Sequence, residues 1–524
     1  MKIERTKNAT RGIIFGSILR LYQMLIPFLM RTIMIYFMGV KYLGLTGLFA
    51  SILQVLNLAE LGIGNAMVFS MYKPIAEDDN ETICALMNLY KKYYRIIGLI
   101  IGSVGLILTP FIPKLISGSL PTELNIYILY FMNLSSTVLT YWLFAYKNCL
   151  LQAHQRVDIV SILTIITNSI QYGIQFFVII YLKNYYLYVL VIIVTQILNN
   201  IITAYVVDKM YPQYKPIGTM DKQFIKKINA RIKDLFTGKI GGVILNSVDT
   251  IVISAFLGLK ILATYQNYYF ILTAIIGLVE TILQSMTAGL GNSFIIESKE
   301  KNYKDLKKFT FMFCWLIGFC TCCFLCLYQP FMKLWVGEKM MLNFFAVICF
   351  CIYFYTYEIN RFINIFKDAA GLWHEDRFRP LTAAIVNLVC NLIMIRFWGI
   401  YGVLFSTVIS LLGIEIPWLL YNMFTIFFDR SFAMEYIIQL VKYTAIVIIN
   451  GKITLLICNL FSGDDLVILL LRLCICIILS NLLFLFIYLK NPYFKESLQL
   501  VDKITKNKLQ LEKKYIKLNK FIKI

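Results

Sequence analysis

Uninterrupted apolar runs of about 20 residues recur along the whole chain, and they limit its fold more than any other feature. Residues 185–207 and 466–488 are two examples, and each is long enough for an α-helix to cross a bilayer. Strands of an outer-membrane barrel alternate apolar and polar residues, which these runs do not. Hydrophobic residues make up 59% of the chain and charged residues 15%. The chain is therefore predicted to be an all-α integral membrane protein, because soluble domains are far more polar.

Fourteen runs have spanning length, so the predicted fold has about 14 transmembrane helices. They cover residues 12–37, 42–71, 90–111, 123–146, 159–182, 186–207, 236–257, 263–290, 309–328, 341–366, 381–397, 401–420, 438–460 and 467–488. The loops on one side, with both termini, hold 33 Lys and Arg, whereas the loops on the other side hold six. The positive-inside rule then predicts a multi-pass protein of the inner, cytoplasmic membrane with both termini cytoplasmic.

Two features favour transport over synthesis. The predicted outer loops reach only about a dozen residues, whereas an enzyme that assembles glycans usually needs a larger outer domain. The sequence also has no G-x-x-x-x-G-K-[ST] phosphate loop. We therefore expect no enzyme, no cofactor and no metal. The net charge of +21 follows the predicted topology, so no nucleic acid is expected as a partner.

Two strings near the start of the chain reappear in its second half. Phe37-Met-Gly39-Val-Lys41 matches Phe256-Leu-Gly258-Leu-Lys260, and Gly62-Ile-Gly-Asn65 matches Gly289-Leu-Gly-Asn292. Six spans separate the copies, which predicts two six-helix lobes related by a pseudo-twofold axis along the membrane normal. Chance similarity between short glycine-containing strings is the alternative.

The repeat predicts how the chain divides. The expected parts are an N-lobe (1–207, spans 1–6), a cytoplasmic linker (208–235), a C-lobe (236–420, spans 7–12), spans 13–14 (421–488) and a basic amphipathic cytoplasmic tail (489–524). Because lysines dominate the tail, we expect it to lie on anionic membrane lipids. Docking of the tail on the protein's own inner face is the alternative.

Ionisable residues inside a span are costly and usually mark a site, so each is a candidate. Arg20 and Arg31 in the first span are three helical turns apart and share one stripe with Pro27 between them. They are candidates for binding an anionic substrate. For Arg31, a side chain that reaches the outer interface is the equally supported alternative.

Three carboxylates are candidates for ion coupling or gating. Glu60 lies in the second span, Asp249 in the seventh and Glu280 in the eighth, one turn before Gln284. For Glu60, a structural ion pair with an arginine of a neighbouring helix is the alternative. Arg31 and Asp249 occupy almost equivalent repeat positions, and their pairing is a hypothesis for closing the outer mouth.

The tenth span ends with Arg361 and Asn364 on one stripe toward the inner face, which predicts part of a cytoplasmic substrate entrance. A helix pair between Glu358 and Arg361 that only neutralises itself is the competing interpretation. Lys147, at the inner end of the fourth span, is a further substrate-binding candidate, and simple positive-inside topology is its alternative.

Most of the 13 cysteines lie inside apolar runs without a neighbouring cluster of His or carboxylates. They are predicted to pack as small apolar residues. Metal binding or redox chemistry at Cys323-x-x-Cys326 is the alternative.

Several strings occur in an order that resembles the Wzx-type polysaccharide flippases of the multidrug/oligosaccharidyl-lipid/polysaccharide exporter superfamily. The resemblance covers spans one to twelve. Its carriers are Gly39-Val-Lys-Tyr-Leu-Gly44, Leu61-Gly-Ile-Gly-Asn65-Ala, Met71-Tyr-Lys-Pro-Ile-Ala-Glu77, Phe144-Ala-Tyr-Lys147, Lys209-Met-Tyr-Pro212, Asp249 with Gly258 and Tyr265, and the block Asp368-Ala-Ala-Gly371-Leu-Trp-His-Glu-Asp-Arg-Phe-Arg-Pro380.

The resemblance implies a V-shaped pair of lobes and a cationic central cavity. It also implies that undecaprenyl-diphosphate-linked oligosaccharide moves to the outer leaflet by alternating access, for capsule or O-antigen. The expected partners are the lipid-linked oligosaccharide and polysaccharide assembly proteins. By analogy with the similar lipid II flippases, spans 13 and 14 are expected to form a lipid groove.

Two other functions remain open. A drug or cation exporter of the same superfamily would share the fold, but its cavity is expected to be rich in carboxylates. A membrane-embedded enzyme that assembles glycans would need an exposed cluster of acids. The one such run is Glu77-Asp78-Asp79, which a solvated loop explains.

Overall fold

The computed structural model describes residues 5–118, 120–461, 463, 465–489, 491–504, 510, 512–513 and 515. Within these residues every regular element is a helix, as predicted. The first half of the chain contains α1 (Arg5–Phe37), α2 (Val40–Leu56), η1 (Asn57–Glu60), α3 (Ile63–Ala76), α4 (Asn80–Leu108), η2 (Thr109–Leu115), α5 (Ile126–Trp142), η3 (Ala145–Lys147), α6 (Asn148–Ala153), α7 (Val157–Phe177), η4 (Val178–Leu182), α8 (Tyr185–Met210) and α9 (Lys222–Leu257).

The second half contains α10 (Leu259–Ile296), α11 (Lys299–Val336), η5 (Glu338–Met340), α12 (Phe344–Ala369), α13 (Arg379–Trp398), α14 (Ile400–Ser410), η6 (Leu411–Glu415), α15 (Ile416–Asn422), η7 (Met423–Phe427), α16 (Phe432–Cys458), α17 (Leu466–Ile475), η8 (Cys476–Ser480), α18 (Asn481–Tyr488) and α19 (Pro492–Ile504). The predicted tail thus begins as a helix, and most residues after 504 lie outside the described part of the chain.

Among the described residues, twelve helices are long and apolar enough to cross a membrane, and a thirteenth span results if α5 and the segment η3–α6, bent by 49°, count as one. The remaining predicted span, 341–366, corresponds to α12, which has 26 residues but carries Glu358, Asn360 and Arg361 in its C-terminal half. At 1.5 Å per residue a helix of this length also reaches across a bilayer. The protein is therefore an all-helical, multi-pass membrane protein.

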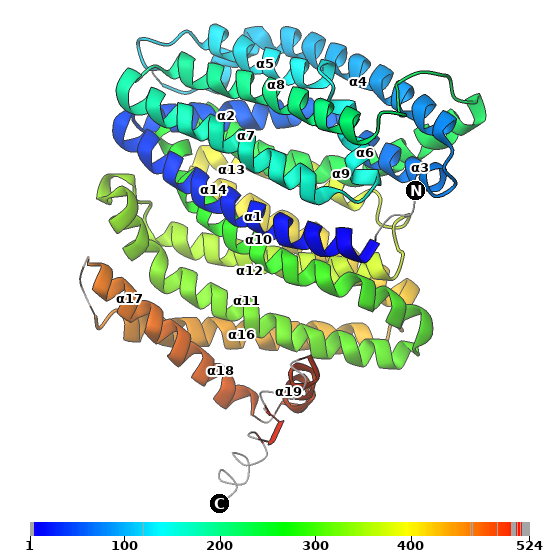
Figure 1. Cartoon of the computed structure of the whole chain (residues 1–524). Coiled ribbons are helices and arrows are strands. Elements are labelled where there is room, and N and C mark those ends of the chain that lie inside the picture. The colour runs from blue at the N-terminus through cyan, green and yellow to red at the C-terminus, as the bar shows by residue number, and fades with distance from the viewer. Residues whose placement is uncertain are drawn as a thin grey trace, which may run out of the picture. The chain divides into compact units, whose positions relative to one another are not determined.

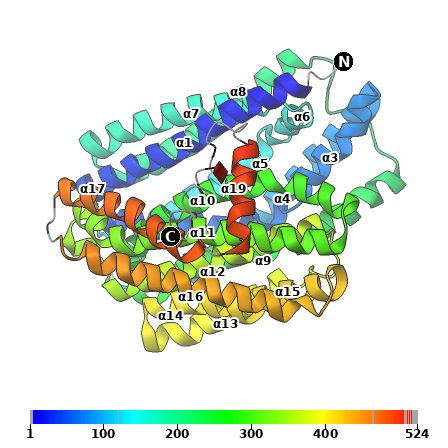
Figure 2. The same ribbon diagram turned by 90° about the horizontal axis from the view of Figure 1, so that it is seen from below.

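The described residues form two compact units. Unit 1 comprises residues 1–266 and 380–403, and unit 2 comprises 267–379 and 404–524. In unit 1, α7 packs between α1 and α8, and α5 packs between α8 and α4 (Figure 1). In unit 2, α11 packs against α12 and α16 and lies between them in Figure 1, and α17 also packs on α11. Figure 2 shows these helices from below. The predicted division into N-lobe, linker and C-lobe stays a prediction, and residues 222–235 of the predicted linker form the first part of α9.

The two copies of the repeat share one local structure and differ in another. Gly39 separates α1 from α2 with φ 112°, and Gly258 separates α9 from α10 with φ 83°. Residues with side chains rarely adopt such positive φ values, which explains glycine at both positions. Gly62, with φ 87°, interrupts the helical backbone between η1 and α3. Its counterpart Gly289 lies inside the continuous helix α10. The prediction of one continuous span over residues 42–71 is therefore wrong. The span ends at Glu60, and α3 begins after Gly62 as a separate helix.

Helix α4 begins ten residues before the predicted span 90–111. Asp79 accepts a hydrogen bond from the backbone N–H of Thr82 at 3.0 Å, which caps the helix. The hydrogen bonds from Thr82 hold the pKa of the Asp79 carboxyl below its usual value. The Asp79 cap thus lets α4 begin before the apolar run from which the span was predicted.

Candidate functional site

An ion pair between α10 and α12 joins two of the predicted site residues in unit 2. The Arg361 guanidinium lies 2.6 Å from Oε1 of Glu280. Gln284, one turn along α10, donates to the same oxygen at 2.9 Å. The Arg361 and Glu280 side chains keep 20% and 30% of their surface exposed. A substrate-binding candidate and a coupling candidate therefore neutralise each other here.

Glu358 lies one turn before Arg361 on α12 and is fully buried. Among the described residues, neither of its carboxylate oxygens has a hydrogen-bond partner. The competing interpretation, in which Glu358 pairs with Arg361, is wrong because Arg361 pairs with Glu280. A buried carboxylate without a hydrogen-bond donor is costly in its charged form.

A buried network of charges surrounds the C-terminal end of α12. The Arg379 guanidinium binds both carboxylate oxygens of Asp376, at 2.7 and 2.8 Å, and also pairs with Glu415. It donates a third hydrogen bond, of 2.8 Å, to Oδ1 of Asn364. Asn360 donates to Glu415 at 3.0 Å. Asn364, which the sequence predicts to line a substrate entrance, thus accepts a hydrogen bond from the buried Arg379.

Lys367 completes this network on its other side. Its ammonium group pairs with Asp368 and lies 3.1 Å from Asp376. It also lies 4.8 Å from the ring centroid of Trp373. Asp376, Arg379 and Glu415 are all at most 5% exposed. This network fixes the loop between α12 and α13, which contains most of the block 368–380.

Glu415 reaches the network because the helix is locally widened. It ends the π-helical segment η6, directly before α15. Pro417 follows two residues later and has no backbone N–H to continue the α-helical hydrogen bonds. Single π-turns of this kind often occur at functional positions. An acid next to a proline inside an apolar run is the sequence signal that our sequence analysis missed.

In unit 1, Glu60 is bound by tyrosine hydroxyls. Tyr94 on α4 donates to Oε1 at 2.5 Å, and Tyr141 on α5 donates to Oε2 at 2.8 Å. Tyr90 donates to the Tyr94 hydroxyl at 2.6 Å. The predicted structural alternative for Glu60 was an arginine partner, whereas its hydrogen-bond partners here are neutral phenols. The Tyr90 and Tyr94 hydroxyls thus form a hydrogen-bonded row that ends at Glu60.

Asp249 on α9 is buried and faces two asparagines of α13. Asn391 donates to Oδ1 of Asp249 at 2.6 Å and to the side-chain oxygen of Asn387 at 3.2 Å. Both asparagines are fully buried. Closure of the outer mouth by pairing of Asp249 with Arg31 stays a prediction.

The two arginines of α1 have different surroundings. Arg20 is exposed, whereas Arg31, three turns further along, is half-buried near Tyr188 of α8. The helix continues through Pro27 from Arg5 to Phe37. Both cations therefore lie on one continuous helix, as the sequence predicts.

Lys147 is buried in η3 and pairs with Asp208 near the end of α8. Its Nζ lies 2.6 and 2.5 Å from the two carboxylate oxygens of Asp208. Of the two side chains, that of Lys147 is 10% exposed and that of Asp208 is 56% exposed. A substrate phosphate would have to compete with Asp208 for this ammonium group.

We expect Asp208→Asn to lower the free energy of unfolding by about 1–3 kcal/mol, because it leaves the buried Lys147 cation without its counter-charge. Lys147→Met removes the buried charge itself and should cost less than Asp208→Asn. Thermal unfolding of the purified protein in detergent measures both, with the exposed Glu81→Gln as control. A larger loss in Lys147→Met would contradict this expectation.

An apolar cavity of about 910 Å³ lies within unit 2, between α11, α12, η6–α15 and α16. Aliphatic and aromatic side chains make up most of its lining, including Ile352, Leu412, Ile416 and Val441. Lys452 of α16 is its one charged lining residue. A cavity with this lining is suited to a lipid chain, with a cation at one place on its wall.

Comparison with known proteins identifies a matching family and solved structures with a similar fold. Residues 9–287, more than half of the chain, match the family described as "Polysaccharide biosynthesis protein". No curated protein matches the chain. The solved structure titled "Lipid II flippase MurJ, inward closed conformation" is similar with a TM-score of 0.65 at 15% identity, covering 91% of this chain and 99% of that one.

A second solved structure is an inward-facing multidrug resistance MATE family transporter of the MOP superfamily. Its TM-score is 0.57 at 15% identity, and the match covers 77% of this chain and 97% of that one. At such identities the similarity concerns the fold, which is that of transporters and flippases. The chain belongs to the polysaccharide biosynthesis protein family and shares the fold of these two solved structures.

Proposed function

We propose that this protein flips undecaprenyl-diphosphate-linked oligosaccharide from the inner to the outer leaflet of the cytoplasmic membrane, for capsule or O-antigen. Both termini are cytoplasmic in this proposal, and transport proceeds by alternating access. The observation that carries it is the match of residues 9–287 to a polysaccharide biosynthesis family in a chain with a flippase and transporter fold. The similar solved structure is named a lipid II flippase, which supports a lipid-linked substrate.

The diphosphate would bind to arginine. A guanidinium group can donate two parallel hydrogen bonds to phosphate oxygens, and it stays charged inside a membrane protein. Arg361 meets this need, because it is partly exposed and its one ion-pair partner among the described residues is Glu280. Asn364, one turn further along α12, can add a neutral donor. Arg20, Arg31 and Lys147 are the further cations of the proposed path.

Competition for Arg361 can gate transport. Glu280 and the diphosphate are both anions, so they compete for the guanidinium group. Movement of Glu280 away from Arg361 would free the guanidinium group for the substrate, and its return would displace the substrate. Glu60 with its row of tyrosine hydroxyls and Asp249 with its asparagines are the corresponding coupling or gating carboxylates of unit 1.

The lipid tail would lie in apolar surroundings while the head group crosses. The cavity of about 910 Å³ in unit 2 is lined almost entirely by apolar side chains of α11, α12, η6–α15 and α16. We propose that part of the undecaprenyl chain occupies it. The chain would come from the hydrocarbon of the bilayer, so the cavity offers it equally apolar surroundings and does not need a hydrophobic gain to accept it.

A drug or cation exporter is the second candidate, and the similarity to a multidrug MATE transporter favours it. A flippase of this kind would bind an anionic diphosphate, whereas a drug or cation exporter would bind a positively charged substrate. Arg361 serves an anion, whereas Glu280, Glu60 and Glu358 would serve a cation.

Depletion of the protein in its native host tests the proposal. We expect diphosphate-linked oligosaccharide to accumulate on the inner leaflet and surface glycan to disappear. Arg20→Ala and Arg361→Ala should fail to restore surface glycan, whereas the exposed Arg377→Ala should restore it. Unchanged surface glycan with increased sensitivity to cationic drugs would contradict the flippase and support the exporter.

A further inference from the structure

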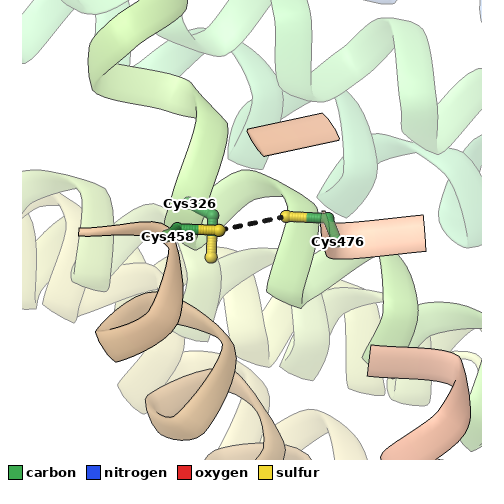
Figure 3. A group of neighbouring side chains, drawn as sticks. All are labelled: Cys326, Cys458 and Cys476. Atoms are coloured by element: carbon green, nitrogen blue, oxygen red, sulfur yellow. Dashed lines mark hydrogen bonds between the residues drawn. The ribbon is translucent and has the colours of Figure 1, made fainter. Parts of the chain in front are cut away.

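Three cysteines from distant parts of the chain meet in the core of unit 2 (Figure 3). Cys326 lies on α11, Cys458 is the last residue of α16, and Cys476 begins η8. Their sulfur atoms all lie within 4.8 Å of one another, and the Sγ atoms of Cys458 and Cys476 are 4.0 Å apart. The exposures of the three residues are 2%, 0% and 0%. Within the described residues, no other group of three metal-ligating side chains is this close.

The spacing of these sulfur atoms fits a metal ion. In a tetrahedral site zinc binds thiolate sulfur at about 2.3 Å, which places the sulfur atoms about 3.8 Å apart. The observed separation of the Cys458 and Cys476 sulfur atoms is 4.0 Å. The three side chains therefore need little movement to surround an ion.

A fourth sulfur donor lies beside the first three. Cys323 packs against the cluster and precedes Cys326 by one helical turn, so both face the same side of α11. Four sulfur ligands complete the tetrahedral set that structural zinc sites use. The alternative raised by Cys323-x-x-Cys326 in the sequence thus acquires two further ligands from α16 and η8.

A cation stands next to the cluster. The Arg472 guanidinium donates to the carbonyl of Phe461 at 3.2 and 2.8 Å, and the Cys458 thiol lies 4.0 Å from the carbonyl oxygen of Arg472. Several thiolates around one Zn²⁺ carry a net negative charge, which Arg472 would partly offset.

We propose that Cys323, Cys326, Cys458 and Cys476 bind a zinc ion that fastens the last two spans to α11. The ligands come from the three elements α11, α16 and η8, so the ion would join them directly. Each cysteine that binds does so as a thiolate and releases its proton to solvent. The proposal does not depend on the substrate of the transporter.

Metal analysis of the purified full-length protein tests this proposal. After exposure to Zn²⁺ and removal of free metal, the native chain should retain close to one zinc ion, with sulfur neighbours at about 2.3 Å in X-ray absorption. A Cys326→Ser, Cys458→Ser, Cys476→Ser triple variant should retain none. Cys474→Ser, an exposed cysteine of α17, is the matched control and should behave like the native chain.

The single variant Cys476→Ala keeps the test valid if the triple variant does not fold. It keeps a small apolar side chain, so it should be produced at the native yield and still lose its zinc. Zinc would also raise the melting temperature of the native chain but not that of Cys476→Ala. Equal zinc in the native and triple variants, no zinc in either, Cu(I) instead of zinc, or a disulfide between Cys458 and Cys476 in the fresh protein would overturn the proposal.

Discussion

Replacing Arg379 with alanine is expected to lower the free energy of unfolding by about 3–5 kcal/mol, because the loss of one partner leaves buried charges uncompensated. Arg379 neutralises Asp376 and Glu415, which are both 4% exposed, and it also binds Asn364. Without it, two carboxylates would share a buried site with Lys367 as their nearest cation.

The melting temperature in detergent, with yield from the membrane fraction, measures this effect. Arg377→Ala is the matched control, since Arg377 lies two residues away in the same loop and is exposed. Glu415→Gln keeps the shape of the side chain and its oxygen acceptor, and should cost less than Arg379→Ala. A melting temperature of Arg379→Ala equal to that of Arg377→Ala would show that the network does not hold the loop.

The second large effect concerns transport. Arg361→Ala is expected to weaken binding of the diphosphate by about 10- to 150-fold, since hydrogen bonds to charged groups contribute about 1.5–3 kcal/mol. Glu280→Gln should have the opposite effect on binding, because it removes the anion that competes for Arg361. It should nevertheless slow transport, because the charge that displaces the substrate is gone.

Binding of a water-soluble diphosphate-linked oligosaccharide to the purified protein measures both variants, and melting temperature controls for folding. The opposite signs separate a role in binding from a structural role. If both variants weakened binding equally, the Arg361–Glu280 pair would only stabilise the fold, and the proposed competition would be wrong.

Much of the fold could be predicted from the sequence because the bilayer imposes it. Backbone groups in hydrocarbon must bond within one segment, so long apolar runs form helices. The positions at which a helix is interrupted or distorted depend on single residues and are harder to predict. Gly62 ends one apolar run through its positive φ, and Pro417 widens another helix into η6. Hydropathy does not report either event.

The candidate site was predictable in part. Arg361 and Glu280 stand out as charges inside spans, but nothing in their spacing shows that α10 and α12 place them 2.6 Å apart. Arg379 was missed because it lies in the predicted inner loop just before the span 381–397, where positive charge follows from topology. Glu415 was missed inside an apolar run. The four cysteines come from three distant elements, and only the folded chain shows that they meet.

A flipping assay with purified protein tests the central claim most directly. The full chain is reconstituted into vesicles that contain undecaprenyl-diphosphate oligosaccharide, and a glycan-degrading enzyme is added outside. We expect the native protein and Arg377→Ala to expose the inner-leaflet pool to the enzyme, and Arg361→Ala to do so at least tenfold more slowly. If vesicles with native protein protected that pool as well as protein-free vesicles do, the protein would not be the flippase proposed here.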